Sequence, residues 1–490
     1  MPAPANLLFL LSDNHARSVV GCYGNPLVRT PVLDALAARG TRFSAAYTAS
    51  PICCPARAAI ATGRYPHQTG YWDNAIVYDG RVRSWMHELR DAGYDVVSVG
   101  KLHFRSTKDD NGFSQEIAPM HILNGKGGVS MLLRWSGREP INRGQWELYL
   151  EKSGVGDTAY QAYDRDITAR AIAWLEERAA RTGRPFALFV SYVSAHPPFT
   201  VPQRLWNLYR DVDVPLPPAF SPAERSEHPW AKNLRERMGF GDIDDPARLA
   251  DILRAYYALS THLDEQMGEV LEAVDRLGLK ASTRVLYTSD HGEAAGAQGL
   301  FGKYSFFEDA AGVPLILAGP DVPAGVVIDE PVSHVDLYPT IVEGAGFEPR
   351  PGSPPLGGES LWPITQGAKR SAPVFGEYHA AGSASGNFML RKGDHKLIYV
   401  VGTPPQLFDL AADPHELHDL ADTPAGRLKV RELEAELRRV CDPEAVDARA
   451  KDDQRRKAEF WGGDEAILAE GLLVYTPPPG VAAETEPAEP

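Results

Sequence analysis

The chain is short of cysteine, of positive charge and of long apolar runs, and each shortage excludes a class of protein. Its four cysteines, Cys22, Cys53, Cys54 and Cys441, are too few and too irregularly spaced in 490 residues for a disulfide framework, which indicates a reducing compartment. With 50 Lys and Arg against 65 Asp and Glu, the formal charge of −15 excludes a general nucleic-acid binder. The N-terminal apolar run, residues 7–11, follows no basic segment and is too short for a signal sequence or membrane span. We therefore expect a soluble, cytoplasmic protein with no membrane or nucleic-acid partner.

The apolar residues that are present fall into short continuous runs, typical of strands buried on both faces of a parallel sheet. These runs lie at residues 6–12, 94–99, 186–193, 284–288 and 313–317. Segments with helical periodicity separate them, at residues 31–39, 85–92, 159–181, 247–277 and 336–343. The alternation predicts an α/β fold with a large, mostly parallel sheet flanked by helices.

The C-terminal part has a different texture. Short strand-like pieces at residues 374–379, 388–391, 396–400 and 406–409 precede one helix at 427–440. They predict a smaller antiparallel α+β domain over residues 369–445, joined to the main domain (1–368) by a linker at 349–358 or 366–373.

Residues 446–490 predict an extended tail that is charged, then proline-rich, with a disordered end. The apolar pairs and runs within it, at 460–461 and 472–475, suggest an arm over residues 455–478 that docks on a neighbouring subunit. We therefore expect a homo-dimer or homo-tetramer.

Polar residues follow several of the predicted strands. In an open α/β sheet, ligands bind outside the carboxyl ends of the strands. The residues at these ends are Asp13, Asn14, Lys101, His103, His196, Asp290 and His291. The sequence therefore places acids, imidazoles and a lysine at one edge of the sheet.

Two carboxylates, one amide oxygen and one imidazole among these residues form a ligand set for a divalent cation. Asp13, Asn14, Asp290 and His291 would suit one Mn²⁺, Ca²⁺ or Mg²⁺ ion. The alternative for the Asp13-Asn14 pair is a turn or a helix cap.

A second feature is the segment around the paired cysteines. Pro55 fits the first turn of a helix that Gly63 ends, so Cys53 and Cys54 lie at the helix N-terminus, with Arg57 one turn further on. There the backbone amides favour an anion and lower the pKa of a thiol. The alternative is a pair of buried cysteines that pack as small hydrophobes. A Cys-x5-Arg phosphatase loop and a P-loop are both absent.

The spacing Cys53-x-Pro55-x-Arg57 resembles the signature of the formylglycine-dependent sulfatases of the alkaline phosphatase superfamily. Further motifs follow in the family's order: Thr62-Gly-Arg-Tyr-Pro-His67, Gly100-Lys-Leu-His103, His196-Pro-Pro-Phe199, Ser289-Asp-His-Gly-Glu293, Gly302-Lys-Tyr304 and residues 407–417. With Asp73-Asn74, the set looks most like the choline-sulfatase and phosphonate monoester hydrolase branch. Asn14 and His291 depart from the commonest residues of the family, which leaves the identity of the metal open. Ala56 stands where serine is common, but the Cys-x-Pro-x-Arg core is kept, so we expect processing of Cys53.

The resemblance implies an alkaline-phosphatase-like fold and hydrolysis of small sulfate monoesters. A maturation enzyme would convert Cys53 to formylglycine, and the side chain at position 53 would join Asp13, Asn14, Asp290 and His291 as a metal ligand. The hydrated aldehyde would attack sulfur, with its oxygen held by the metal and Arg57. The alternative activity is hydrolysis of phosphonate monoesters or phosphodiesters with the same nucleophile, and a non-catalytic member of the family is a further alternative.

The resemblance also implies the remaining roles. Lys101, His103, Lys303 and Asn74 would contact the sulfuryl oxygens. His196, helped by Lys303, would protonate the leaving oxygen, and His103 would take a proton from the diol. Residues 111–157, which include Met131, Trp135 and Trp146, are predicted to form a specificity insertion.

Overall fold

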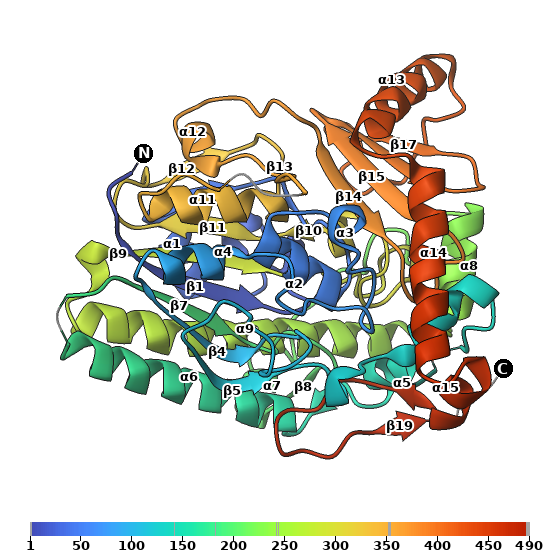
Figure 1. Ribbon diagram of the computed structural model, residues 1–490. Coiled ribbons are helices and arrows are strands. Elements are labelled where there is room, and N and C mark those ends of the chain that lie inside the picture. Colours follow the sequence, from blue (N-terminus) through green and yellow to red (C-terminus); the bar gives the residue numbers. More distant parts are fainter. Residues whose placement is uncertain are drawn as a thin grey trace.

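The computed structural model describes residues 2–141, 143–181, 183–241, 243, 245–350 and 354–486. At its centre lies an eight-stranded sheet (Figure 1). In spatial order the strands are β12 (Val326–Ile328), β2 (Gly40–Phe43), β11 (Leu315–Ala318), β9 (Thr283–Ser289), β1 (Asn6–Ser12), β7 (Phe186–Ser191), β4 (Asp95–Lys101) and β5 (Gln115–Met120). Strands β9, β1, β7, β4 and β5 pair in parallel, so the predicted α/β fold with a mostly parallel sheet is confirmed.

Strand β1 is buried on both faces because helices cover both sides of the sheet. Phe9 and Leu11 pack into one apolar cluster, whereas Leu8 and Leu10 pack into the opposite one. Successive side chains of a strand point to opposite faces, so a strand covered on both sides is apolar at every position.

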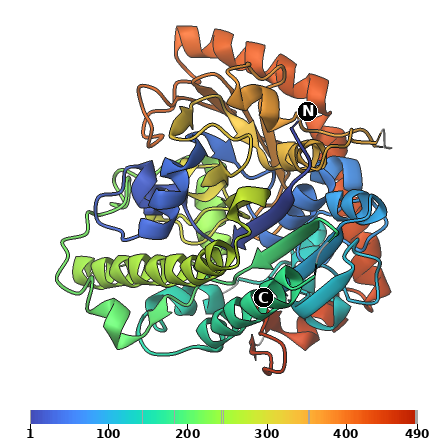
Figure 2. The same cartoon turned by 90° about the vertical axis from the view of Figure 1, so that its left-hand side faces the viewer.

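Two layers of helices provide this cover. The first layer consists of α2 (Cys53–Thr62), α4 (Trp85–Asp91) and α11 (Leu337–Gly344), and the second consists of α1 (Pro31–Ala38), α6 (Ala159–Ala179) and α9 (Pro246–Arg276). Helices α6 and α9 lie side by side along the second face, as Figures 1 and 2 show.

The apolar run at residues 313–317 differs from its prediction as a parallel strand. Pro314 divides it, so β10 (Gly312–Val313) pairs with β3 (Ala46–Tyr47), while β11 enters the main sheet antiparallel to β9. A parallel return requires a crossover helix, and between β9 and β11 the chain forms only the four-residue α10 (Glu308–Ala311) and one 3₁₀ turn. Strands β2, β5 and β12 were not predicted from the sequence.

The C-terminal region contains an antiparallel sheet of β14 (Val374–Tyr378), β15 (Asn387–Lys392), β16 (His395–Val400) and β17 (Gln406–Asp409), followed by α13 (Pro424–Val440). The predicted antiparallel sheet and helix are thus confirmed. The division of the chain at residues 368 and 445 stays a prediction, and residues 351–353 of one proposed linker lie outside the described residues.

The predicted extended tail is largely helical. Residues 443–460 form α14 (Pro443–Phe460), which the Asp442 side chain caps, and α15 (Asp464–Glu470) follows. The side chains of Ile467, Leu472 and Val474 are buried against their own chain. Figure 1 shows α14 running beside the C-terminal sheet. The tail therefore packs on its own subunit, and its role in oligomerisation stays a prediction.

Shorter elements complete the described chain: α3 (Pro66–Thr69), α5 (Arg143–Leu150), α7 (Gln203–Trp206), α8 (Pro229–Arg237), α12 (Leu361–Thr365), β6 (Gly154–Val155), β8 (Thr200–Val201), β13 (Val332–Ser333), β18 (Leu472–Leu473) and β19 (Thr485–Glu486). Of the helices within the described ranges, none combines the length and apolarity needed to cross a membrane.

Candidate active site

The carboxyl ends of four parallel strands meet at one edge of the sheet (Figure 1). Asp13 and Asn14 follow β1, Lys101 ends β4, His196 lies beyond β7 and Asp290 follows β9. All five side chains are buried. The structure therefore brings together the residues that the strand ends predicted, while their roles in catalysis stay predictions.

Arg57 holds the two carboxylates of this cluster. Its Nη2 donates to Asp13 Oδ2 at 3.0 Å and its Nε donates to Asp290 Oδ2 at 2.8 Å. Its Nη1 donates to the Lys101 carbonyl and to Ser191 Oγ. All three guanidinium nitrogens thus have protein partners. Arg57 therefore positions the two carboxylates, and its expected contact with the oxygen of the nucleophile stays a prediction.

The surroundings shift the pKa values of Asp13 and Asp290 in opposite directions. Burial alone would raise the pKa of Asp13, but Lys101 and other neighbouring cationic groups, Arg57 among them, hold it well below its usual range. Burial and the negative charge of Asp13 raise the pKa of Asp290. Asp13 is therefore the firmly ionised member, and a further cation beside the pair would favour ionisation of Asp290 as well.

His291 presents an acceptor nitrogen to Cys53. Its Nδ1 lies 3.0 Å from the Gly292 carbonyl, which can only accept, so Nδ1 carries the proton. The unprotonated Nε2 then lies 3.3 Å from Cys53 Sγ. Burial lowers the pKa of His291 and favours this neutral form. A fixed tautomer with a free Nε2 is the form in which histidine binds metals.

Glu293 orients the amide of Asn14. The Asn14 Nδ2 donates to Glu293 Oε2 at 2.7 Å, so Oδ1 points the other way and accepts from Lys303 Nζ at 3.2 Å. Glu293 itself is fixed by the amides of Ala295 and Gly302, which donate to Oε1. Asn14 therefore offers an oxygen, rather than an NH₂ group, to the cluster.

Two buried lysines add positive charge. Lys303 Nζ lies 3.0 Å from Cys53 Sγ, and Lys101 Nζ lies 2.7 Å from Asp13 Oδ2. Burial opposes the charge on Lys303, but Cys53 and Asp13 outweigh it and raise the pKa. Lys303 is therefore a permanently charged group next to position 53.

His103 is held without a hydrogen-bond partner. Both of its ring nitrogens are buried and unpaired among the described residues. Burial, then Lys101 and Arg57, hold its pKa well below the usual range, so the ring is neutral. His103 and Asn14 also have left-handed backbones, with φ of +54° and +56°, and such strain is concentrated at functional sites. His103 is thus available to accept a proton.

Among the described residues, only one ring nitrogen of His196 has a hydrogen-bond partner. Its Nδ1 donates to the Pro197 carbonyl at 2.7 Å, and Tyr160 packs edge-on against the ring with centroids 5.8 Å apart. Burial, Lys303 and Lys101 hold its pKa well below the usual range. The ring is therefore neutral, whereas the predicted protonation of a leaving oxygen needs the cation.

A cavity of about 60 Å³ opens onto this cluster. Cys53, Asn74, His103, His196 and Lys303 line it, together with Met131, Gln145 and residues 473–476. The Asn74 Oδ1 accepts from the backbone amide of Cys54 at 3.0 Å, which leaves the NH₂ group of Asn74 for another partner. Six of the predicted site residues do not line the cavity: Asp13, Asn14, Arg57, Lys101, Asp290 and His291.

The predicted specificity insertion contributes only in part. Met131 and Gln145 line the cavity, and Gln145 also donates to the Val474 carbonyl. Trp146 instead packs against Phe240 and Phe301. The C-terminal segment at residues 473–476 forms a wall that the sequence did not predict.

The ligand set fits a divalent cation. Ligand atoms of Asp13, Cys53, Asp290 and His291 all lie within 4.8 Å of one another, and all four residues are buried. Two carboxylates, a neutral imidazole and an amide oxygen held by Glu293 are hard or intermediate donors of the kind that Mn²⁺, Ca²⁺ and Mg²⁺ bind.

Sequence reasoning gave no role to two carboxylates that position the site. Glu293 orients Asn14, and Asp164 accepts the amides of Val193 and Ser194 just before His196. Glu293 belongs to the family motif at residues 289–293, and that motif could have indicated its role. Asp164 lies within a helical segment and carries no such signal.

The sequence matches the Sulfatase family over residues 5–347 and the C-terminal region of N-sulphoglucosamine sulphohydrolase over residues 296–442. The region matched to the Sulfatase family contains the buried cluster of cation ligands, the Cys-x-Pro-x-Arg helix and the central α/β sheet. The chain belongs to the sulfatase family of hydrolases.

Curated relatives agree with this assignment. The chain is 33% identical over 477 residues to a choline-sulfatase of Rhizobium meliloti, covering 94% of this chain and 91% of the relative. It is 32% identical over 451 residues to arylsulfatase K of Bos taurus, covering 86% and 79%. A solved phosphonate monoester hydrolase of Agrobacterium radiobacter has a TM-score of 0.70 at 22% identity, over 91% of this chain and 96% of that one. This last likeness concerns the fold.

Proposed function

We propose that the chain hydrolyses sulfate monoesters of small alcohols, using a formylglycine made from Cys53 and one divalent cation. The observation that supports this most directly is the buried cluster of cation ligands at Cys53, next to Lys303 and two neutral histidines. The family and its relatives support sulfate ester hydrolysis. The formylglycine and the metal are the parts we propose.

Formylglycine and the divalent cation would supply chemistry that the unmodified side chains lack. Hydrated formylglycine supplies a geminal diol, on the Cβ atom that bears the Cys53 thiol, and a maturation enzyme must produce it. A divalent cation held by Asp13, Asn14, Asp290, His291 and the side chain at position 53 supplies Lewis acidity that lowers the pKa of a hydroxyl.

The chain's own cations recognise the anionic ester. Lys303 Nζ, 3.0 Å from Cys53 Sγ, faces the reacting position and stabilises charge that develops on the sulfuryl and leaving oxygens. The NH₂ group of Asn74 lines the same cavity. Lys101 is bound to Asp13, and its ammonium has two further donors for a sulfuryl oxygen.

The two histidines divide the proton transfers. His103, neutral and unpaired, accepts a proton from the hydroxyl at position 53. The Nε2 of His196 gives a proton to the leaving oxygen, because an anionic ester beside the ring raises its pKa from the low value that burial, Lys303 and Lys101 impose. Lys303 assists this step as a fixed charge.

Mass spectrometry of the peptide that spans residue 53, from protein made in its native host, tests the nucleophile. We expect the mass of formylglycine, and an unmodified thiol would contradict the mechanism. Cys53→Ala should abolish hydrolysis in metal-loaded protein. Cys54→Ala, which removes the adjacent thiol but keeps the backbone amide that Asn74 accepts from, is the matched control and should stay active.

The preferred ester is tested by comparing two esters of one phenol. We expect a higher kcat/KM for a sulfate monoester than for a phosphonate monoester of the same phenol. A large phosphonate advantage would support the alternative, a phosphonate monoester or phosphodiester hydrolase. Choline sulfate belongs in the same panel, because one relative is named a choline-sulfatase.

We also propose a cytoplasmic homo-dimer or homo-tetramer with domains at residues 1–368 and 369–445. The described tail covers its own chain, so an oligomer contact would use its exposed side chains. Phe460, with 72% of its surface exposed, is the largest of these.

A further inference from the structure

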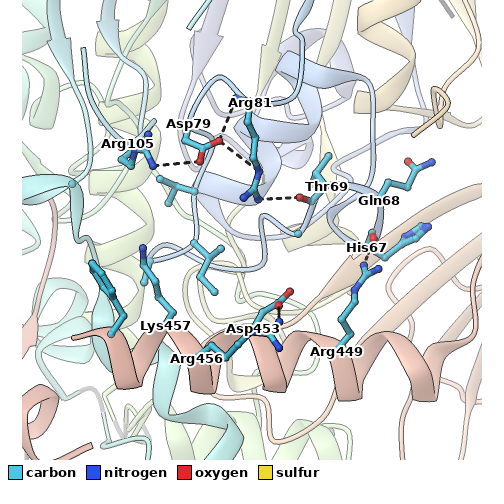
Figure 3. A pocket seen from close by; sticks show the side chains of 16 residues that line it. His67, Gln68, Thr69, Asp79, Arg81, Arg105, Arg449, Asp453, Arg456 and Lys457 are labelled. Atoms are coloured by element: carbon cyan, nitrogen blue, oxygen red, sulfur yellow. Dashed lines mark hydrogen bonds and ion pairs between the residues drawn. The ribbon is translucent and has the colours of Figure 1, made fainter. Parts of the chain in front are cut away.

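A second cavity, of about 600 Å³, lies between α14 and the segment of residues 67–81 (Figure 3). None of its described lining residues also lines the cavity at Cys53. Its charged lining consists of Arg81, Arg105, Arg449, Arg456, Lys457, Asp79 and Asp453. The lining has five basic and two acidic side chains, and two carboxylates outside it, Asp109 and Asp452, pair with Arg105 and Arg456, so a surplus of one positive charge remains.

The two acidic side chains of this cavity already have several partners. Asp79 accepts from the Tyr71 hydroxyl at 2.8 Å and pairs with Arg81 at 3.7 Å and Arg105 at 3.4 Å. Figure 3 shows both arginines turned toward this one carboxylate. Arg105 also pairs bidentately with Asp109, whose carboxylate does not line the cavity, so the charge of Arg105 is balanced.

Asp453 is held in the same way on the opposite wall. It accepts from Trp72 Nε1 at 2.7 Å and pairs with Arg456. Neither acidic side chain of the cavity therefore remains to pair with Lys457.

Lys457 projects from α14 into the cavity, as Figure 3 shows. Across the described chain, no carboxylate lies within ion-pair distance of its Nζ. Its contacts are ring faces instead, with Phe460 at 5.4 Å and Trp461 at 5.5 Å from Nζ to the centroid. Burial, followed by the charge of Arg105, lowers the pKa of Lys457, and Asp73 and Asp79 oppose this shift.

We propose that this cavity binds a small organic ester of phosphate or sulfate. Lys457 and Arg81 supply the charge that a tetrahedral oxyanion requires, and an arginine fork suits its oxygens. The volume of about 600 Å³ is that of a cavity for a whole small molecule rather than an inorganic ion. Phe460, largely exposed at the rim, offers a face for the ring of a sugar or an aryl group.

Equilibrium dialysis of the full chain against labelled glucose 6-phosphate and inorganic phosphate tests the proposal. We expect a site for glucose 6-phosphate whose affinity does not depend on Lys303. Lys457→Gln and Arg81→Gln should each weaken this site about tenfold to a hundredfold, since a charged hydrogen bond is lost. Lys303→Ala should leave it unchanged.

Lys451→Gln is the matched control, because Lys451 lies on the same helix but pairs with Asp447 outside the cavity. The site should survive this change. Binding that disappears with Lys303→Ala would overturn the proposal, as would unchanged binding in both Lys457→Gln and Arg81→Gln. Equal affinity for inorganic phosphate and glucose 6-phosphate at this site would overturn the assignment of an organic ester.

Discussion

Replacing Glu293 with glutamine should reverse the orientation of Asn14 and weaken metal binding. The amides of Ala295 and Gly302 can only donate, so the side-chain oxygen of the new glutamine would stay with them and its NH₂ group would face Asn14. Two NH₂ groups cannot bond each other. The Asn14 amide would therefore turn, offering its oxygen to residue 293 and its NH₂ group to the metal site and to Lys303.

The expected loss of metal affinity follows from the role of Glu293, which orients the ligand Asn14. Removing a group that orients a metal ligand lowers metal affinity by about 10-fold to 100-fold, which corresponds to about 1.4 to 2.7 kcal/mol. Competition with a chelating dye for Mn²⁺ and Ca²⁺, at one fixed pH, measures the change. Circular dichroism and thermal unfolding of the same samples show whether the fold is kept.

A double variant that exchanges the donor and acceptor roles of residues 14 and 293 is the decisive control. In the double variant Asn14→Asp with Glu293→Gln, the carboxylate at 14 offers oxygens on every side and accepts from the amide at 293. Metal affinity should then recover to the wild-type level or above it. The reasoning is refuted if Glu293→Gln binds metal as tightly as wild type, or if the folded double variant stays as weak as the single one.

Three further predictions concern stability and assembly. Arg57→Met should lower the free energy of unfolding by about 3–5 kcal/mol, because it strands Asp13 and Asp290 in the interior. Urea unfolding measures this loss. A loss as small as that of Arg170→Met, which breaks an exposed pair with Asp166 worth below about 1 kcal/mol, would contradict the prediction. Burial opposes ionisation of Glu377, but His67 and His379 bring its pKa down to about 2. Because the pKa of Glu377 is lower in the folded than in the unfolded protein, its ionisation adds about 3 kcal/mol to the free energy of unfolding above pH ~4.5, and this is lost as the pH falls toward 2. In Glu377→Gln, stability should not show this loss between pH ~4.5 and 2. Acid-unfolding curves that coincide for the variant and the wild type would contradict the prediction. Deleting residues 455–478 should reduce the assembly size in light scattering, whereas an unchanged size would remove the oligomer proposal.

The main sheet could be predicted from the sequence because its central strands are buried on both faces. Residues 6–12 are apolar without interruption between Leu7 and Leu11, and β1 begins and ends at the predicted bounds. The direction of β11 could not be predicted, since direction depends on the connection rather than on the strand's own residues. Helix α14 was missed because small or polar residues, among them Ala450 and Gln454, form its buried face and leave little apolar periodicity.

The candidate site, like the fold, could be predicted from the sequence only in part. Strand ends identified Asp13, Lys101, His196 and Asp290, because the fold rule places ligands there. Lys303 came from the family motif, since it follows no strand. The positioning of Asn14 by Glu293 depends on a contact across 279 residues, which no local pattern records. Local rules thus predict which side chains reach the site, whereas tertiary contacts decide how each is oriented.

These orientations also explain how an acidic protein can bind an anionic ester. The net charge of −15 describes the surface, where opposite charges pair and water screens them. In the interior, Arg57 pairs with two carboxylates, and the proposed mechanism assigns recognition of the ester to Lys303, Lys101 and Asn74. Burial favours the neutral form of both His103 and His196, so in that mechanism each can exchange a proton without adding a fixed charge. The proposal thus assigns the binding of the anion to a lysine that its neighbours keep charged, and the transfer of protons to imidazoles that burial keeps neutral.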